Sequence, residues 1–569
     1  MTMIPVLLTC ALLADFSDDL KRIQAHLKVG DEAVAVLEAR KIVENYPSEP
    51  VSYVTYITAL AQSGDLTQML EVWDMFAKLY PEQAHQQRVL EAMCWGILRQ
   101  GRGSSTLSTR LLSIIGATLT QDAYALDFLL SGLRDSNTAI RALSVELASL
   151  LGDRPLKDEI LHLLAHEKKQ EVRLEVLRAV AKLRLSEAYE ELLRIVESKH
   201  TSAEERALAI SAILEISQHI NAQQLHRLAS DPRAALRLIA AEMIAKFEEH
   251  DQVDLLIKLS QDPQPEVAAA ALRTIGLLRI PRFQNKSMVE YLRPLTKTSD
   301  SLVGITASWG ILLHDEQEGI EVFQHWIMHE KEDVRAMAAA AVAAAGPYGV
   351  QAALKFLKMT HDPYVQINLA KVLVGQRVNC EEACQIINNF LLNHQEKWME
   401  AENVFAPLTR SHLSHRPGIP NYPEVVNQTL RLEWINVLAM LEYPHAAEAL
   451  RAFLQSRPYG VTGLAAEMLL GEGDEMAIEH VRSLLADTDK HIRAEAALVL
   501  ATWGRDPSAI PVLLEVYPEA DRMLKIKILE ALGRIGHVST IPFLIERLKE
   551  PSMNVRIIAA SVLIQSLNH

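Results

Sequence analysis

The apolar positions of this chain recur at the spacing expected for amphipathic helices packed in pairs. From about residue 105 onward, an apolar residue followed by a polar one, most often arginine, returns roughly every 31 to 36 residues, which is the length of one helix pair. The rungs of this ladder are Ile140-Arg141, Val172-Arg173, Arg206, Leu236-Arg237, Val267-Ala268, Val303-Gly304, Val334-Arg335, Val365-Gln366, Lys397, Leu430-Arg431, Val461-Thr462, Ile492-Arg493, Leu524-Lys525 and Val555-Arg556. The pattern predicts an all-α array of helix pairs.

An acidic residue often precedes the rung and indicates where its helix starts. At Asp231-Pro232 and Asp262-Pro263 the acid is followed directly by proline. Aspartate is a favoured N-cap, and proline is tolerated at the first helical position because its missing N–H would be unpaired there anyway. The second helix of each repeat is therefore expected to begin just after the acid, with the ladder arginine in its first turns. The acids are Asp135, Glu167, Asp231, Asp262, Asp487, Glu519 and Glu550.

The first hundred residues have a different spacing. Gly30-Asp31 returns as Gly64-Asp65, and Pro47 returns as Pro81, both after about 34 residues. Glycine supplies a turn between two helices, and proline ends a helix because it lacks the N–H. These two segments resemble the tetratricopeptide repeat, and the stretch 84–101 resembles a degenerate third copy.

The ladder from about residue 105 to residue 569 resembles the HEAT repeat, in the short form also found in phycobilin lyases. The resemblance implies a right-handed superhelical α-solenoid whose arginine-bearing second helices line the concave face. It also implies that the repeated acid and arginine pair between neighbouring repeats. On this basis the structural ladder residues are Asp135 with Arg141, Asp231 with Arg237 and Asp487 with Arg493, together with Arg173, Arg335 and Arg556.

Five segments follow from these patterns. They are 1–14, a first solenoid helix or a short signal; 15–104, tetratricopeptide-like repeats; 105–400, HEAT repeats; 401–428, a proline-rich projecting loop; and 429–569, HEAT repeats. The apolar run 4–14 lacks a preceding Lys or Arg, which favours a solenoid helix and a cytoplasmic protein over an exported one. No run reaches the roughly 18–20 apolar residues of a membrane span.

Two interruptions of the array are candidates for partner contacts, because functional residues concentrate on loops of repeat proteins. Extra residues occur near 279–287. A longer break at 402–425 contains several prolines, which are incompatible with a helix interior. The partner-binding residues expected at the second break are Trp398, Arg410, His412, His415, Arg416 and Tyr422.

Charge and motifs favour a protein-binding scaffold over an enzyme. The net charge of −15 disfavours nucleic acid as the partner. Cys380 and Cys384 lack a second ligand pair, so we expect no metal and no cofactor. Deoxyhypusine hydroxylase, an enzyme on this fold, holds iron with His-Glu dyads, but His166-Glu167 and His329-Glu330 lie at helix starts and read as solvated caps. A lyase or hydroxylase, or an exported envelope-associated assembly factor, stays as an alternative.

The last helix, about residues 554 to 567, is apolar nearly all round, so it needs neighbours on most of its sides. Two readings follow. Ile557, Ile564 and Leu567 either make an end-on contact with a second copy or a partner, or they pack into the core of their own repeat.

Overall fold

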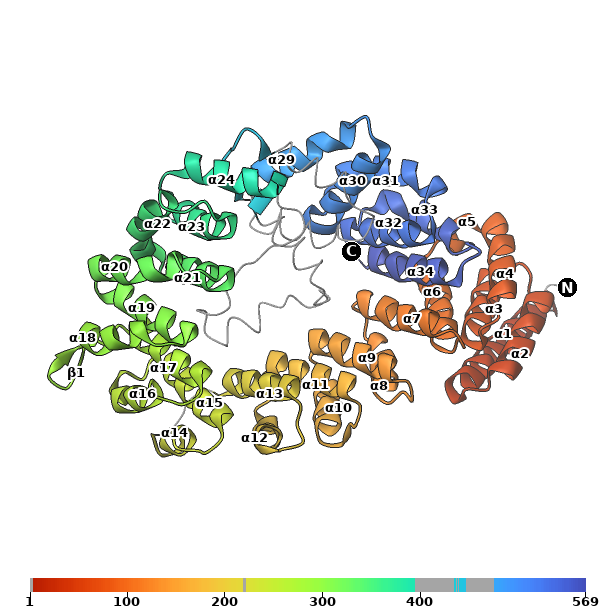
Figure 1. Cartoon of the computed structure of the whole chain (residues 1–569). Helices are drawn as coiled ribbons and strands as arrows, with labels where there is room; N and C mark the ends of the chain where they lie inside the picture. Colours follow the sequence, from red (N-terminus) through yellow and green to blue (C-terminus); the bar gives the residue numbers. More distant parts are fainter. Residues whose placement is uncertain are drawn as a thin grey trace. The chain divides into compact units, whose positions relative to one another are not determined.

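The computed structural model describes residues 4–217, 222–393 and 475–568, and all of 434–446 except positions 436 and 439. Their fold is an all-α solenoid of stacked helix pairs (Figure 1). The chain divides into two compact units. Unit 1 combines both ends of the chain, Met1–Leu151 and Val481–His569, and unit 2 is Gly152–His480.

The N-terminal part of unit 1 consists of helices joined by short turns. Gly30 (φ 78°) follows the first helix and Gly64 (φ 80°) follows the third, so both adopt the left-handed conformation that the predicted turns require. Asp65 then caps the fourth helix by accepting the backbone N–H of Gln68 at 3.0 Å. The helices are α1 (Ile4–Val29), α2 (Glu32–Asn45), α3 (Pro50–Ser63), α4 (Leu66–Leu79), α5 (Pro81–Ala84), α6 (Gln87–Arg102), α7 (Leu107–Leu119), α8 (Ala125–Leu133) and α9 (Thr138–Leu151).

The C-terminal part of unit 1 repeats a shorter pattern, in which a one-turn 3-10 helix leads into α31 and another leads into α33. Proline occupies the first turn of both helices. The elements are α29 (Glu475–Ser483), which spans the boundary of the units, η6 (Leu484–Ala486), α30 (Lys490–Gly504), η7 (Pro507–Ala509), α31 (Ile510–Val516), η8 (Tyr517–Glu519), α32 (Arg522–Ile535), η9 (Val538–Thr540), α33 (Ile541–Arg547) and α34 (Met553–Leu567).

The two parts of unit 1 meet where α34 packs against α6 and α7 (Figure 1). The same α34 packs on its sequence neighbours α32 and α33, and α6 also packs on α3. Helix α6 therefore has neighbours on three sides, which explains why every residue from Met93 to Leu98 is buried. Ser561 in α34 donates its hydroxyl to the carbonyl of Gly116 in α7 at 2.5 Å, and Thr109 donates to Asn554 at 2.8 Å.

Unit 2 is built of two layers of helices. In the second layer each helix packs on the next, in the order α11 (Gln170–Leu183), α13 (Ala203–Ile216), α15 (Ala234–Lys246), α17 (Pro265–Leu277), α19 (Ser301–His314), α21 (Glu332–Ala344) and α23 (Pro363–Gly375). The first layer covers one side of it with α10 (Arg154–His166), η1 (Ser186–Ala188), α12 (Tyr189–Glu197), α14 (Ala222–Ala229), η2 (His250–Gln252), α16 (Val253–Leu259), α18 (Met288–Leu292), η3 (Arg293–Lys297), α20 (Glu316–Ile327), η4 (Gly346–Gly349) and α22 (Val350–Leu357). Helix α24 (Cys380–Asn393) packs on α23.

The predicted interruption at 279–287 contains a small hairpin. Strands β1 (Arg282–Phe283) and β2 (Lys286–Ser287) pair in antiparallel fashion, with Phe283 opposite Lys286. The hairpin lies between α17 and α18, so it is an addition to the helix-pair pattern rather than a replacement for a helix.

Trp309, Trp326 and Trp434 are buried. Helix α1 begins at Ile4, within the apolar run 4–14, and the choice between a solenoid helix and a signal for this segment stays a prediction. The tetratricopeptide assignment and the division by repeat type stay predictions, because helix pairs alone do not establish them.

Candidate protein-interaction face and its supporting ladder

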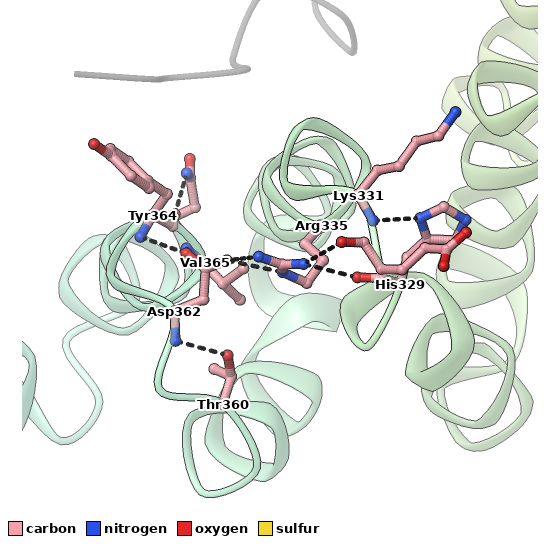
Figure 2. A network of polar contacts seen from close by, with 9 residues as sticks. His329, Lys331, Arg335, Thr360, Asp362, Tyr364 and Val365 are labelled. Carbon is pink, nitrogen blue, oxygen red and sulfur yellow. Dashed lines mark hydrogen bonds and ion pairs between the residues drawn. The ribbon is translucent and has the colours of Figure 1, made fainter. Parts of the chain in front are cut away.

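The ladder arginine joins two consecutive repeats, as Figure 2 shows for Arg335. Its Nη1 atom donates to the backbone carbonyls of His329 (2.9 Å) and Glu330 (3.0 Å), in the turn before its own helix. Its Nε and Nη2 atoms reach the carboxylate of Asp362 in the next repeat, at 2.8 and 2.6 Å. Asp362 also caps α23 by accepting the N–H of Tyr364 at 3.0 Å. One guanidinium thus fixes a turn and the start of the next second-layer helix.

The same double contact recurs along the chain. Arg237 donates to the carbonyl of Asp231 at 2.9 Å and to both carboxylate oxygens of Asp262 at 2.5 and 2.8 Å. Cation–acid pairs between successive repeats are also formed by Arg110 with Asp135, Arg173 with Glu205, and Lys525 with Glu550. Gln366, which occupies a ladder position, makes only the first of these contacts: its side-chain amide donates to the backbone carbonyl of Thr360 at 3.1 Å.

The side-chain pairs that the resemblance implied are not formed: the partner of the acid lies one repeat away for Asp135 and in the same repeat for Asp231. Arg141, Arg237 and Arg493 contact the backbone carbonyls of Asp135, Asp231 and Asp487, at 2.9, 2.9 and 3.0 Å. The carboxylate of Asp135 instead receives Arg110 of the preceding repeat. That of Asp231 receives Arg233 at 2.8 Å. The acid lies beside the preceding second-layer helix because it stands in the turn that leads into its own, so the assigned side-chain pairs were wrong.

The two remaining ladder arginines differ from each other. Arg173 follows the rule, with the carbonyl of Glu167 at 3.1 Å and the carboxylate of Glu205 as partners. Arg556 is half-buried, and its Nε atom has no hydrogen-bond partner among the described residues. Burial lowers the pKa of this guanidinium. The difference arises because the helices beyond Arg556 are α6 and α7, which do not supply a ladder acid at this place.

Burial and hydrogen bonding shift the pKa values of the ladder acids in opposite directions. Burial alone would raise the pKa of Asp262, but hydrogen bonds from Arg237 and from the N–H of Gln264 outweigh it and hold the pKa below its ordinary value of 3.8. In Glu205, burial is likewise outweighed by the hydrogen bonds from Arg173 and Ser202, which lower its pKa. Both acids are therefore charged at neutral pH and stabilise the stack in that form.

Four second-layer helices of unit 2 present a repeated set of side chains, which we call the grid face. Residues four apart lie on the same side of a helix, so each helix contributes three positions to this face. The same positions recur from repeat to repeat, at a fixed offset from the ladder. The grid face consists of Leu174, Arg178 and Lys182 on α11, Ala207, Ser211 and Glu215 on α13, Leu238, Glu242 and Lys246 on α15, and Ala269, Arg273 and Leu277 on α17.

The grid face combines a buried polar centre with exposed margins. Glu242 and Arg273 form an ion pair between α15 and α17, with exposed fractions of only 2% and 7%. Arg178, Lys182 and Leu277 are exposed, Leu277 by 41%. The twelve positions carry four cations and two carboxylates, and Arg178 is also paired with Glu175 and Glu204 beside the face. The grid positions recur at the repeat length in the sequence, but the Ala and Leu residues among them are typical of a buried core, so the sequence alone did not identify this face.

The predicted partner-binding residues fall into two groups. Trp398, Arg410, His412, His415, Arg416 and Tyr422 lie outside the described residues. In α34, Ile557 and Ile564 are completely buried, and Leu567 is half-buried. An end-on contact needs these side chains exposed. That reading was wrong for Ile557 and Ile564, because the chain's own packing buries them, and Ile557 lies against α6 and α7.

The part of the chain that the structure describes contains neither a metal-binding cluster nor a membrane-spanning helix. No cluster of three or more His, Cys, Asp or Glu side chains has a metal-binding arrangement there. Cys380 and Cys384 are free thiols, and burial raises the pKa of Cys384 to about 11. Among the described helices, none combines the length and the apolar character needed to cross a bilayer.

Comparison with known proteins agrees with the repeat geometry. A family model described as HEAT repeats matches residues 253–343, 447–525 and 478–564. The chain contains HEAT repeats. The matched HEAT segments cover less than half of the 569 residues, and the ladder continues the same pattern outside them. No curated protein sequence matches the chain.

Similar solved structures are other large helical proteins. A structure of Kap121p bound to Pho4p shares 12% identity over 93% of this chain and 80% of that one, with a TM-score of 0.36. A full-length homology model of the AP-3 complex shares 11% identity over 80% and 94% (TM-score 0.33). The myosin chaperone UNC-45 from C. elegans shares 12% over 91% and 72% (TM-score 0.30).

Proposed function

We propose that this HEAT-repeat chain is a non-enzymatic scaffold that binds a protein partner on the second-layer helices of unit 2. The grid face carries the proposal. It places side chains at equivalent positions on four successive helices, and ladder pairs join α11 to α13 and α15 to α17. Such a surface suits an extended protein segment, because it offers many similar contacts in a row.

The composition of the grid face favours protein over other partners. Leu174, Leu238 and Leu277 supply apolar contact area, and Arg178 and Lys182 supply donors at the margin. Apolar positions flanked by charged ones are typical of protein interfaces. The proline-rich segment 402–425 remains a second proposed contact, for the sequence reasons given above.

The experiment compares partner recovery by matched variants. The tagged full chain is used to capture partners from its native cell, and recovery is quantified by mass spectrometry. Arg178→Glu/Lys182→Glu reverses two exposed charges of the grid face. Lys355→Glu/Lys358→Glu makes the same change on and just after α22, in the first layer of the same unit, where both lysines are exposed.

The proposal predicts a partner that is retained by the control variant and lost by the grid variant. Equal recovery with both variants, at unchanged helical content, would overturn the grid face as the binding surface. Replacing residues 408–422 with a Gly-Ser linker tests the second contact separately, and unchanged recovery would remove it.

A further inference from the structure

The hairpin between α17 and α18 is an insertion into a stack of helices that is otherwise continuous. The ladder step from Ala268 to Gly304 is longer than the usual one by about five residues, which is the size of a short hairpin loop. The second-layer helices stack continuously past it, α17 on α15 and α19 on α17. Insertions of this kind in repeat proteins map to surface loops, where binding residues concentrate.

The base of the hairpin is held rigidly. The N–H of Met288 donates to the carbonyl of Pro281 at 3.0 Å, and Ser287 forms a capping box with Glu290. The ring of Phe283 meets that of Tyr291 edge-on, with centroids 6.2 Å apart. A loop that is already ordered loses less conformational entropy when a ligand binds it.

Basic side chains dominate the exposed part of this element. Arg282 and Lys286 are both exposed. Arg279, also exposed, stacks its guanidinium 3.9 Å from the centroid of the Tyr348 ring and donates Nη1 to the carbonyl of Leu313 at 2.7 Å. This arrangement fixes the plane of the guanidinium and leaves most of its N–H donors unused, a geometry suited to a carboxylate.

We propose that the hairpin and Arg279 form a docking site for an acidic protein segment, a run of Asp and Glu side chains. Glu290, the acid within residues 279–297, is engaged in the capping box. Three cations within one short loop can engage a few carboxylates. Affinity for nucleic acid rests mainly on neutralising many backbone phosphates, and three cations can neutralise only a few, which favours the short acidic peptide.

The test uses direct binding and does not require the scaffold partner to be known. A fluorescent peptide of alternating Asp and Glu is titrated with the full chain, and anisotropy is recorded at low and high salt. The variants are Arg282→Glu/Lys286→Glu on the hairpin and Lys168→Glu/Lys169→Glu, an exposed pair before α11, as control. The grid variant Arg178→Glu/Lys182→Glu is the third arm.

We expect binding by the wild type, weaker at high salt, and a loss of about tenfold or more in the hairpin variant, since like charges now face the peptide. The control and grid variants should bind as the wild type does. Absence of wild-type binding, equal binding by the hairpin variant, or tighter binding of a single-stranded oligonucleotide of the same charge would each overturn the proposal. Loss of peptide binding in the grid variant, with full binding by the hairpin variant, would also overturn the hairpin site. The proposed function of the grid face is tested separately, by partner capture.

Discussion

A Cβ atom placed on Gly101 of α6 would lie 2.6 Å from the Cδ1 atom of Ile557 in α34, so a larger residue there would force the Ile557 side chain to shift. On α7, a Cβ placed on Gly116 would lie 3.1 Å from Leu98 Cδ2 and at ordinary contact distance, 3.4 Å, from Ile557 Cγ2. The last helix of the chain therefore completes the packing of helices near its beginning, across more than 400 intervening residues.

Disrupting α34 should loosen α6 and α7. Ile557→Asp places a carboxylate in this contact and removes a buried side chain, at a cost of at least about 2–5 kcal/mol. We expect faster hydrogen exchange of the α6 and α7 amides, with α2 unchanged. Val538→Asp makes a similar change at a 67% exposed position and serves as control. Unaltered protection of α6 would contradict the contact.

A second glycine sets the approach of α3 to α6. A Cβ on Gly96 would lie 2.7 Å from the backbone oxygen of Ala61, and a backbone atom cannot move aside as a side-chain end can. Gly96→Ala should destabilise unit 1 by about 1–3 kcal/mol, the usual cost of overpacking. Gly103→Ala, at the end of the same helix with nearest atoms 3.7 Å away, should be close to neutral. Denaturant melts of both variants give the comparison, and equal midpoints would disprove it.

The ladder arginine should contribute through two separable contacts. Arg335→Gln is expected to keep the carbonyl contact, as Gln366 does naturally, and to lose the pair with Asp362. Arg335→Ala loses both, so it should cost more, by about 1 kcal/mol for the extra hydrogen bond. Hydrogen exchange of α21 and α23 measures the difference. Equal effects of the two variants would show that the carbonyl contact adds nothing.

Lowering the pH should destabilise the packing between second-layer helices of unit 2. The pKa of Asp262 is lowered in the folded protein, so its contribution is complete above the unfolded value, near 3.8, and disappears as pH falls through the lower folded value. The α15–α17 interface should therefore lose hydrogen-exchange protection below about pH 4. In Asp262→Asn this part of the pH dependence should vanish, whereas Asp254→Asn, at an exposed position of α16, should retain it.

The two compact units should unfold separately. Because unit 1 is formed from both ends of the chain, probes at Trp95 and in α32 are expected to report the same transition, while Trp326 in unit 2 reports another. The overall unfolding would then be broad, as expected for a repeat array. A single sharp transition seen by all three probes would contradict this division.

Features that recur at the repeat length could be predicted from the sequence, whereas contacts that occur only once in the fold could not. The helix pairs and the place of the insertion at 279–287 follow from spacing. The prediction that the acids are N-caps was wrong: each helix begins three residues after its acid, and the cap is a residue such as Gln264 for Asp262 or Asp489 for Asp487. The side-chain partner of Asp135 was misassigned because a ladder shows only the repeat length, and the contact with Arg110 depends on how the turn lies on the preceding helix. The apolar surface of α34 predicted that something must cover it, but no local pattern identifies α6 and α7, which are distant in the chain.

The contact between α34 and α6 has a consequence for biosynthesis. A ribosome releases α6 early, yet the helix that covers its far side emerges only after about 450 more residues, or roughly 20–90 s at ordinary rates of translation. Throughout that interval the apolar side chains of α6 that α34 later buries are open to water and to other nascent chains. Unit 1 can therefore reach its native packing only once α34 has been translated, and products truncated before α34 should depend on chaperones or aggregate.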